Sequence, residues 1–163
     1  VLDFARGRLG GGITLVRDAN HPLEPVLRQV VDELRTTMPE RVIETDFRIA
    51  DPVNCDRSRM GQMISNLIGN ALTHGSPDHP VRIAASTDHG MFELWVANAG
   101  EPIADAAMTN LFQPFFRGQV RASLQGLGLG LHIASEIAKA HEGTLTVTST
   151  PDETRFTFLM PLR

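Results

Sequence analysis

The chain has 163 residues, 42% of them hydrophobic and 21% charged, which predicts one globular domain with a sizeable core and excludes a disordered tail. Its formal net charge of −4 argues against a nucleic-acid surface, because basic residues would have to cluster to overcome phosphate repulsion, and they do not. The lone Cys55 permits no internal disulfide and fits a reducing compartment, and every apolar stretch is far shorter than the ~20 residues of a membrane span. We therefore expect a cytoplasmic segment without nucleic-acid or membrane contact, although the intact protein could be membrane-anchored.

The first half of the chain contains two amphipathic helix patterns, each preceded by a strand pattern. Residues 1–10 are typical of a helix end that begins without a cap, so we assign 1–12 to the end of a preceding helix with its linker, and 13–163 to one domain. Hydrophobic periodicity and helix breakers predict four further elements: a strand at 13–17, a helix at 22–38, a strand at 42–49 and a helix at 56–74.

The second half contains two hairpin patterns separated by helices. The predicted elements are strands at 81–87 and 91–98, a short helix at 104–112, a polar loop at 117–125, a helix at 127–141, and strands at 144–148 and 154–160. Gly143 occupies the C′ position expected after the last helix. Because hairpins require an antiparallel or mixed sheet, the expected fold class is α+β, a two-layer sandwich with the helices on one face.

A glycine-rich segment precedes the last predicted helix. Its sequence is Gly126-Leu127-Gly128-Leu129-Gly130-Leu131. Glycines let the backbone approach a ligand closely, and the free N–H groups at a helix N-terminus favour an anion. The segment is neither the lysine-containing phosphate loop nor the dinucleotide fingerprint, because it lacks the lysine and no strand precedes it. The alternative interpretation is a flexible loop before a tightly packed helix start.

Two asparagines lie four residues apart on the predicted helix at 56–74. Asn66 and Asn70 therefore share a helix face, although asparagine is a poor residue for a helix interior. Amide oxygens suit Mg²⁺, which prefers hard oxygen ligands and retains several waters. The alternative is a pair of amides that bind other protein groups or face solvent.

Two further motifs follow the first hairpin. Asn98 and Gly100 stand in Asn-Ala-Gly-Glu-Pro-Ile at the end of a predicted strand, where the amide offers donors and an acceptor, or forms an ordinary turn. The segment Leu-Phe-Gln-Pro-Phe-Phe-Arg-Gly follows at 111–118; its phenylalanines are core or hinge residues, and Arg117 could reach a phosphate.

Together, in this order and spacing, the four motifs resemble those of the ATP-binding catalytic domain of two-component sensor histidine kinases, within the wider GHKL ATPase group. Residues 66–70 look like the N box, 98–103 the G1 box, 112–116 the F box and 126–130 the G2 box. The resemblance extends over residues 13–161 and implies a mixed, mostly antiparallel sheet with three helices on one face. By the same resemblance, residues 1–12 are similar to the end of a dimerisation and phosphoacceptor hairpin.

The resemblance also implies roles for individual residues. Asn70 would ligate Mg²⁺, Asn66 would support the phosphates, and a lid at 117–125 would close over them. Gly100 and Ile103 would line the adenine pocket, and the glycine backbone would cradle the phosphates. The implied nucleotide-binding residues are Asn66, Asn70, His74, Asn98, Gly100, Ile103, Phe116, Arg117, Gly126, Leu127, Gly128, Leu129, Gly130 and Leu131. His74 is equally well explained as a histidine at a helix end.

Two residues depart from the pattern of the family. Asn98 stands where the G1 box usually has aspartate, so we expect weaker ATP binding and poorer rejection of GTP. Thr73 stands where many relatives carry lysine or arginine for phosphate; Arg117 or Arg121 could supply that charge, or be ordinary surface arginines.

The resemblance implies transfer of the ATP γ-phosphoryl group to a histidine, but none of the six histidines of this chain has the setting of the family's acceptor helix. We therefore expect a monomer that binds Mg²⁺ and ATP without phosphorylating itself. Its partners would be the dimerisation and phosphoacceptor hairpin of the same kinase and a response regulator. The alternatives are a nucleotide-binding regulatory module without transfer activity and an anti-sigma-type serine kinase.

Overall fold

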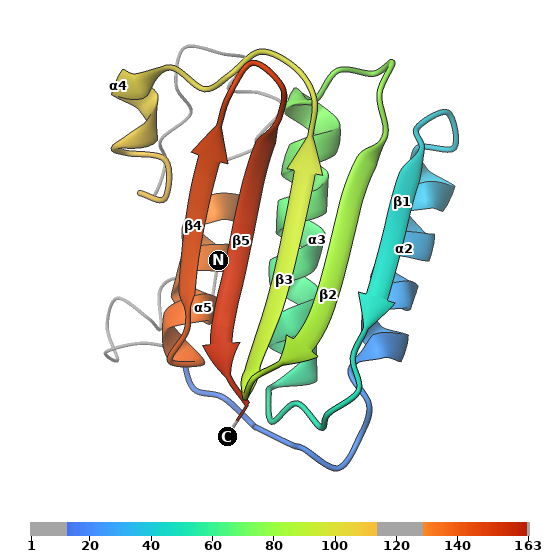
Figure 1. The fold of residues 1–163 in the computed structure, drawn as a ribbon, viewed down its shortest axis with the longest axis vertical. Coiled ribbons are helices and arrows are strands. Elements are labelled where there is room, and N and C mark those ends of the chain that lie inside the picture. The colour runs from blue at the N-terminus through green and yellow to red at the C-terminus, as the bar shows by residue number, and fades with distance from the viewer. Residues whose placement is uncertain (1–12, 114–128, 163) are drawn as a thin grey trace.

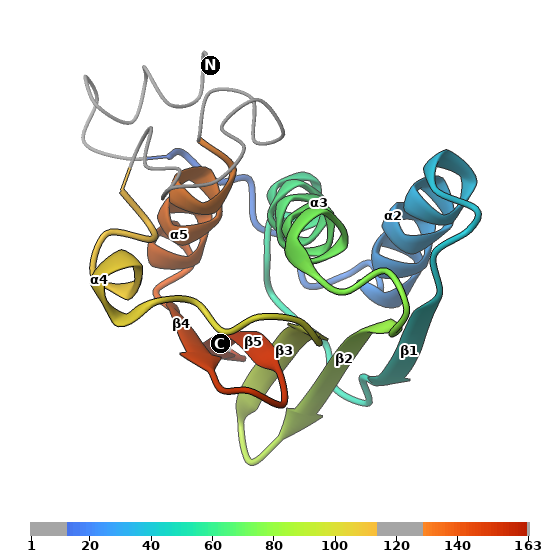
Figure 2. The same ribbon diagram turned by 90° about the horizontal axis from the view of Figure 1, so that it is seen from above.

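The computed structural model describes residues 13–113 and 129–162, in which a five-stranded sheet is covered on one face by helices (Figure 1). Seen from above, α2, α3 and α5 lie side by side on the same side of the sheet (Figure 2). The elements are α2 (Glu24–Thr37), β1 (Ile43–Arg48), α3 (Arg57–His74), β2 (Val81–Asp88), β3 (Met91–Asn98), α4 (Asp105–Met108), α5 (Gly130–Ala140), β4 (Thr144–Ser149) and β5 (Thr154–Pro161). The expected α+β two-layer fold with three helices on one face is confirmed.

The sheet is mixed, with strand order β1-β2-β3-β5-β4. β1 runs parallel to β2, and every other neighbouring pair is antiparallel. Alternate side chains of the strands point toward the helices, so Phe92, Phe156 and Phe158 are fully buried in the core between the two layers. Because β3 pairs with β5, the end of the first hairpin lies beside the start of the last strand.

Helix α3 is the central helix of the layer. It begins after Asp56, whose carboxylate accepts a hydrogen bond from the Arg59 N–H at 3.1 Å and so caps the first turn. Its apolar residues recur every three or four positions and are buried. These are Met60, Met63, Ile64, Leu67, Ile68, Ala71 and Leu72. Burial of each large apolar side chain stabilises the fold by about 1.5–3 kcal/mol. The polar residues of α3, Asn66 and Asn70 among them, lie outside this buried face.

Helix α5 ends in a Schellman motif. The Glu142 N–H donates to Lys139 O and the Gly143 N–H donates to Ala138 O, both at 2.9 Å. The left-handed residue is Glu142, at φ 61°, so the prediction that Gly143 takes the C′ position is wrong by one residue. Gly143 is required for another reason, because a Cβ there would lie 2.6 Å from Leu159 O and 2.8 Å from the Phe158 ring.

Two predicted elements differ from the structure. The segment 13–17 forms no strand. Among the described residues, the only β-pairing next to it is a single antiparallel bridge between Asp18 and Cys55. The bridge cannot extend because Asp56 already caps α3. The helix predicted at 104–112 is only α4, and the chain then continues in turns, with Asn110 N–H donating to Ala107 O at 3.2 Å. Thr109 and Asn110 are weak helix formers, which explains the early end.

One end of the molecule gathers segments that are distant in the sequence. The C-terminal ends of α3 and β3 and the turn between β4 and β5 lie at the upper end of Figure 1, and the start of α5 meets α3 near the middle of that helix, at Asn66. No helix in the described ranges is long and apolar enough to cross a membrane.

Candidate functional site

The predicted asparagine pair lies on α3 where this helix faces α5. Asn66 Nδ2 donates a hydrogen bond to Gly130 O at 3.1 Å, and both residues are partly buried. This bond joins positions that are 64 residues apart in the sequence. It brings the asparagine motif to Gly130, which is both the last glycine of the glycine-rich segment and the first residue of α5. Asn70 lies one turn further along α3 and is also partly buried.

The start of α5 presents main-chain groups to this region. A helix leaves its first N–H groups without intrahelical acceptors and carries a partial positive charge there. The side chains of Leu129 and Leu131 are buried, so these residues can offer a ligand only their main chain. Asn66 therefore lies beside a helix N-terminus that suits an anion.

Asn98 ends β3 and is buried, with 7% of its surface exposed. Its Nδ2 donates to Ala99 O at 3.1 Å, which leaves Oδ1 as the acceptor that the side chain can offer to a ligand. The turn after α3 packs directly against it, because a Cβ at Gly75 would lie 2.9 Å from Asn98 Cβ and 2.5 Å from Ala71 O. Only glycine allows this approach of the helix end to the strand end.

The two residues after Asn98 hold the same turn. Ser76 N–H donates to Ala99 O at 2.7 Å. Gly100 has φ 140°, and a Cβ there would lie 3.2 Å from the Ser76 nitrogen. The turn at 75–77 and the loop at 98–100 are therefore locked together by main-chain contacts.

Two hydroxyl residues that were not predicted as site residues lie beside this loop. Ile103 N–H donates to Ser149 Oγ at 2.8 Å, and Ser149 Oγ lies 2.6 Å from Thr154 Oγ1. Thr154 is paired with Asn98 in the β3–β5 register and is 5% exposed. Nothing in the local sequence of the terminal hairpin indicates that Thr154 lies beside Asn98. This position follows only from the pairing of β3 with β5, which are distant in the sequence.

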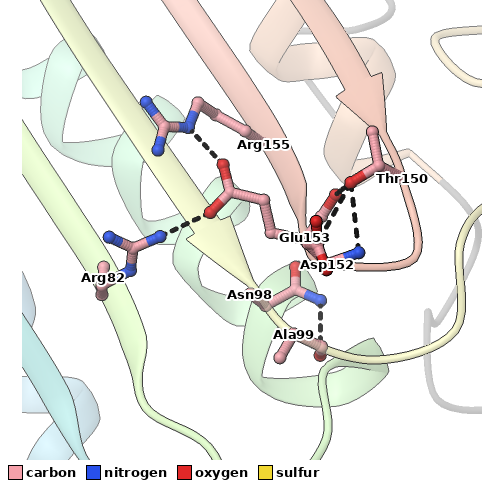
Figure 3. Close-up of polar contacts among 7 residues, drawn as sticks. All are labelled: Arg82, Asn98, Ala99, Thr150, Asp152, Glu153 and Arg155. Atoms are coloured by element: carbon pink, nitrogen blue, oxygen red, sulfur yellow. Dashed lines mark hydrogen bonds and ion pairs between the residues drawn. The ribbon is translucent and has the colours of Figure 1, made fainter.

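The turn between β4 and β5 lies next to Asn98 and is held by ion pairs of Glu153 (Figure 3). Glu153 accepts from Arg155 Nε at 2.8 Å and also pairs with Arg82. The ring of Trp95 lies under Arg155, whose guanidinium carbon is 3.8 Å from the ring centroid. A cavity of about 190 Å³ opens here, and its lining residues are His79, Pro80, Arg82, Asn98, Ala99, Asp152 and Glu153.

The remaining predicted site residues fall into three groups. Ile103 packs against the core at the edge of the site. His74 is exposed at the end of α3. The third group lies outside the described residues, together with the predicted lid at 117–125; it consists of Phe116, Arg117, Arg121, Gly126, Leu127 and Gly128.

The fit of the site to a metal depends on Asn70. The described ranges hold no cluster of three or more His, Cys, Asp or Glu side chains that could bind an ion without help. Asn70 is a partly buried residue one helical turn from Asn66, and an asparagine amide contains the kind of hard oxygen that Mg²⁺ prefers. This donor set fits Mg²⁺ that takes most of its ligands from phosphate and water.

Comparison with known families identifies the family of the chain. The model of the histidine kinase-, DNA gyrase B- and HSP90-like ATPases matches residues 55–163, which include α3, the loop after β3 and α5. The chain belongs to this family. Domains of this family bind ATP, and the relatives below place the chain with the ATP-binding domains of sensor histidine kinases.

Individual relatives agree with this assignment. The chain is 32% identical over 165 residues to a bacteriophytochrome of Pseudomonas aeruginosa, covering 100% of this chain and 22% of that protein. It is 38% identical over 109 residues to the probable sensor histidine kinase TcrY of Mycobacterium tuberculosis, covering 66% of this chain and 23% of that protein. Full-length ShkA in complex with AMPPNP is 28% identical, with TM-score 0.79 over 98% of this chain and 34% of that one. The chain thus spans about a fifth of these curated relatives.

Proposed function

We propose that the chain is the catalytic ATP-binding part of a histidine kinase, and that it transfers the γ-phosphoryl group of ATP to a histidine on a dimerisation hairpin of the same kinase. The observation that carries the proposal is the Asn66–Gly130 hydrogen bond, which holds the N-box helix against the start of α5. Phosphoryl transfer requires positioning and charge neutralisation more than covalent chemistry from the protein. The contact between α3 and the start of α5 would position the phosphates and bring amide and main-chain N–H groups to their charge.

The nucleotide would lie with its base at the end of β3 and its phosphates between α3 and α5. Asn98 Oδ1 would accept a hydrogen bond from the adenine amino group, with Gly100 and Ile103 beside the base. The first N–H groups of α5 would bind phosphate oxygens. The AMPPNP complex of the ShkA relative supports an adenine nucleotide as the ligand.

Asn70 would hold Mg²⁺ through its amide oxygen, and Asn66 would fix the spacing of the two helices. When bound, the ion would neutralise charge on the phosphate oxygens. The residues of this chain then bind and orient the triphosphate, while the nucleophile comes from elsewhere.

Several histidines of the chain are engaged in the fold. His141 is fully buried: its Nε2 accepts from the Asp56 N–H at 3.1 Å, and its Nδ1 donates to Ile137 O at 2.9 Å. His21 pairs with Asp18 at 2.5 Å, and His132 Nδ1 lies 3.0 Å from Phe112 O. The buried His141 is therefore unavailable as a phosphoryl acceptor, and the proposal assigns the acceptor histidine to the hairpin. A response regulator would then take the phosphoryl group from that histidine.

The proposal is tested by mixing the chain with the separately produced hairpin of its kinase, Mg²⁺ and γ-labelled ATP. We expect acid-labile phosphohistidine on the hairpin and no label on the chain alone. The Asn70→Ala variant should abolish transfer, whereas Gln29→Ala, which removes an exposed amide on α2, should not change it. Nucleotide binding without transfer to the hairpin would support the regulatory-module alternative instead, and label on a serine of a partner protein would support the anti-sigma-type alternative.

A further inference from the structure

Arg41 is a buried arginine between α2 and β1, with 8% of its surface exposed. Its Nη1 donates to Leu72 O at 2.6 Å and its Nη2 to Ser76 O at 3.3 Å. Both partners are main-chain carbonyl oxygens, and Nε is buried without a hydrogen-bond partner among the described residues. One guanidinium therefore joins the last turn of α3 to the turn that follows it.

Burying a guanidinium is costly unless the surroundings compensate its charge. The C-terminal end of α3 does so, because the last carbonyls of a helix lack intrahelical donors and carry partial negative charge. Arg41 acts in this way as a C-terminal cap supplied from the turn between α2 and β1, 31 residues before Leu72 in the sequence.

The turn that Arg41 holds is the one that contacts the base end of the proposed nucleotide site. Ser76 is bound on both sides: its carbonyl accepts from Arg41, and its N–H donates to Ala99 O at 2.7 Å. The preceding Gly75 lies against Asn98, and Gly100 lies against the Ser76 nitrogen. A shift of the turn must therefore move the loop that carries Asn98.

We propose that Arg41 is a positioning residue for adenine recognition: it touches no nucleotide, but it fixes the turn at 75–77 against which Asn98, Ala99 and Gly100 are set. The inference rests on the proposed function, since it assumes that the base binds at this loop. Removing the guanidinium takes the Arg41 donor from Leu72 O and leaves Ser76 O with the His79 N–H, at 3.2 Å, which loosens the turn and with it the loop that carries Asn98.

The test compares Arg41→Met with Arg35→Met in the 163-residue chain. Arg35 is the control, because its Nη2 also donates to a main-chain carbonyl, that of Ile43 at 2.6 Å, but away from the site. Unlike Arg41, it is exposed and also pairs with Asp32 at 3.5 Å. Mg²⁺ and AMPPNP are titrated at a temperature where circular dichroism shows each variant folded. We expect the Kd of Arg41→Met to rise by up to about tenfold, because nucleotide binding must then restore the turn, which can cost as much as one charge-assisted hydrogen bond. The Kd of Arg35→Met should stay within twofold of the parent.

Two further measurements distinguish positioning from general stability. Amide NMR shifts of Ser76, Ala99 and Gly100 should move in nucleotide-free Arg41→Met but not in Arg35→Met. The Arg41→Lys variant, which keeps the cation and can reach one carbonyl, should recover part of the affinity, and it carries the test if Arg41→Met does not fold. Unchanged shifts, a Kd within twofold of the parent, or equal losses in both arginine variants would overturn the inference. Absence of AMPPNP binding by the parent chain would refute the proposed function, while the shifts would still report on the turn.

Discussion

Gly75 offers the sharpest test of the packing between the end of α3 and the end of β3. In Gly75→Ala the added Cβ would lie 2.5 Å from Ala71 O and 2.9 Å from Asn98 Cβ. Both neighbours are backbone or the base of a side chain, so neither can rotate away. The helix end must separate from the strand end, a change of the overpacking kind that costs about 1–3 kcal/mol.

Part of this cost is offset, because alanine reduces the conformational entropy of the unfolded chain and stabilises by about 0.4–1 kcal/mol where its backbone is compatible. Gly75 has φ −76°, which alanine adopts freely, so the offset applies in full. The net loss is about 1–2 kcal/mol, which for a domain of this size lowers Tm by about 2–8 °C.

The matched control is Gly69→Ala on the same helix. A Cβ at Gly69 meets no atom within 4 Å, so this variant should gain about 0.5–1 kcal/mol from helix propensity. Urea unfolding followed by circular dichroism measures both variants against the parent chain. Equal stabilities of Gly75→Ala and the parent chain, or a loss in Gly69→Ala, would refute the packing derived from the structure.

Three other predictions concern single side chains. Burial lowers the pKa of His141 below its usual value, so the folded chain binds fewer protons than the unfolded chain and its stability should fall as pH drops below about 6.5; a stability–pH slope unchanged in His141→Gln would contradict this. Asn98→Asp should bind ATP more tightly by about 1 kcal/mol and reject GTP better, yet lose stability because the hydrogen bond to Ala99 O is lost; competition titration and urea unfolding measure the two effects, and an unchanged ATP preference would show the reasoning to be wrong. Burial raises the pKa of the Cys55 thiol to about 11, so a thiol reagent at pH 8 should label Cys55 only when the domain unfolds locally or globally. Labelling of the native chain at the rate of a free thiol would contradict the burial of Cys55.

Local sequence patterns predicted the elements whose signals are themselves local. The 3.6-residue period of α3 identified its buried face, and the strand pairs around short turns identified both hairpins. The segment at 13–17 failed because alternation alone cannot show whether a partner strand exists. Asp56 starts a helix where that partner would have to continue.

The candidate site was predictable only where a motif stands in consecutive residues. Asn66 and Asn98 were predicted from such motifs, and the structure brings Asn66 to Gly130. Their roles toward a nucleotide stay predictions. Thr154 and Arg41 were not found, because their relation to the site arises from the β3–β5 pairing and from a contact across 31 residues. Such relations are tertiary, and no spacing in the sequence encodes them locally.

The central claim is that an amide pair on α3 and the N-terminus of α5 together bind a nucleoside triphosphate with its metal ion. Calorimetric titration of AMPPNP into the chain, with and without Mg²⁺, tests it most directly. The account predicts saturable binding at one site that weakens without Mg²⁺ and weakens about tenfold or more in Asn70→Ala. No binding at millimolar nucleotide, or equal affinity with Mg²⁺ present and absent in both proteins, would contradict it.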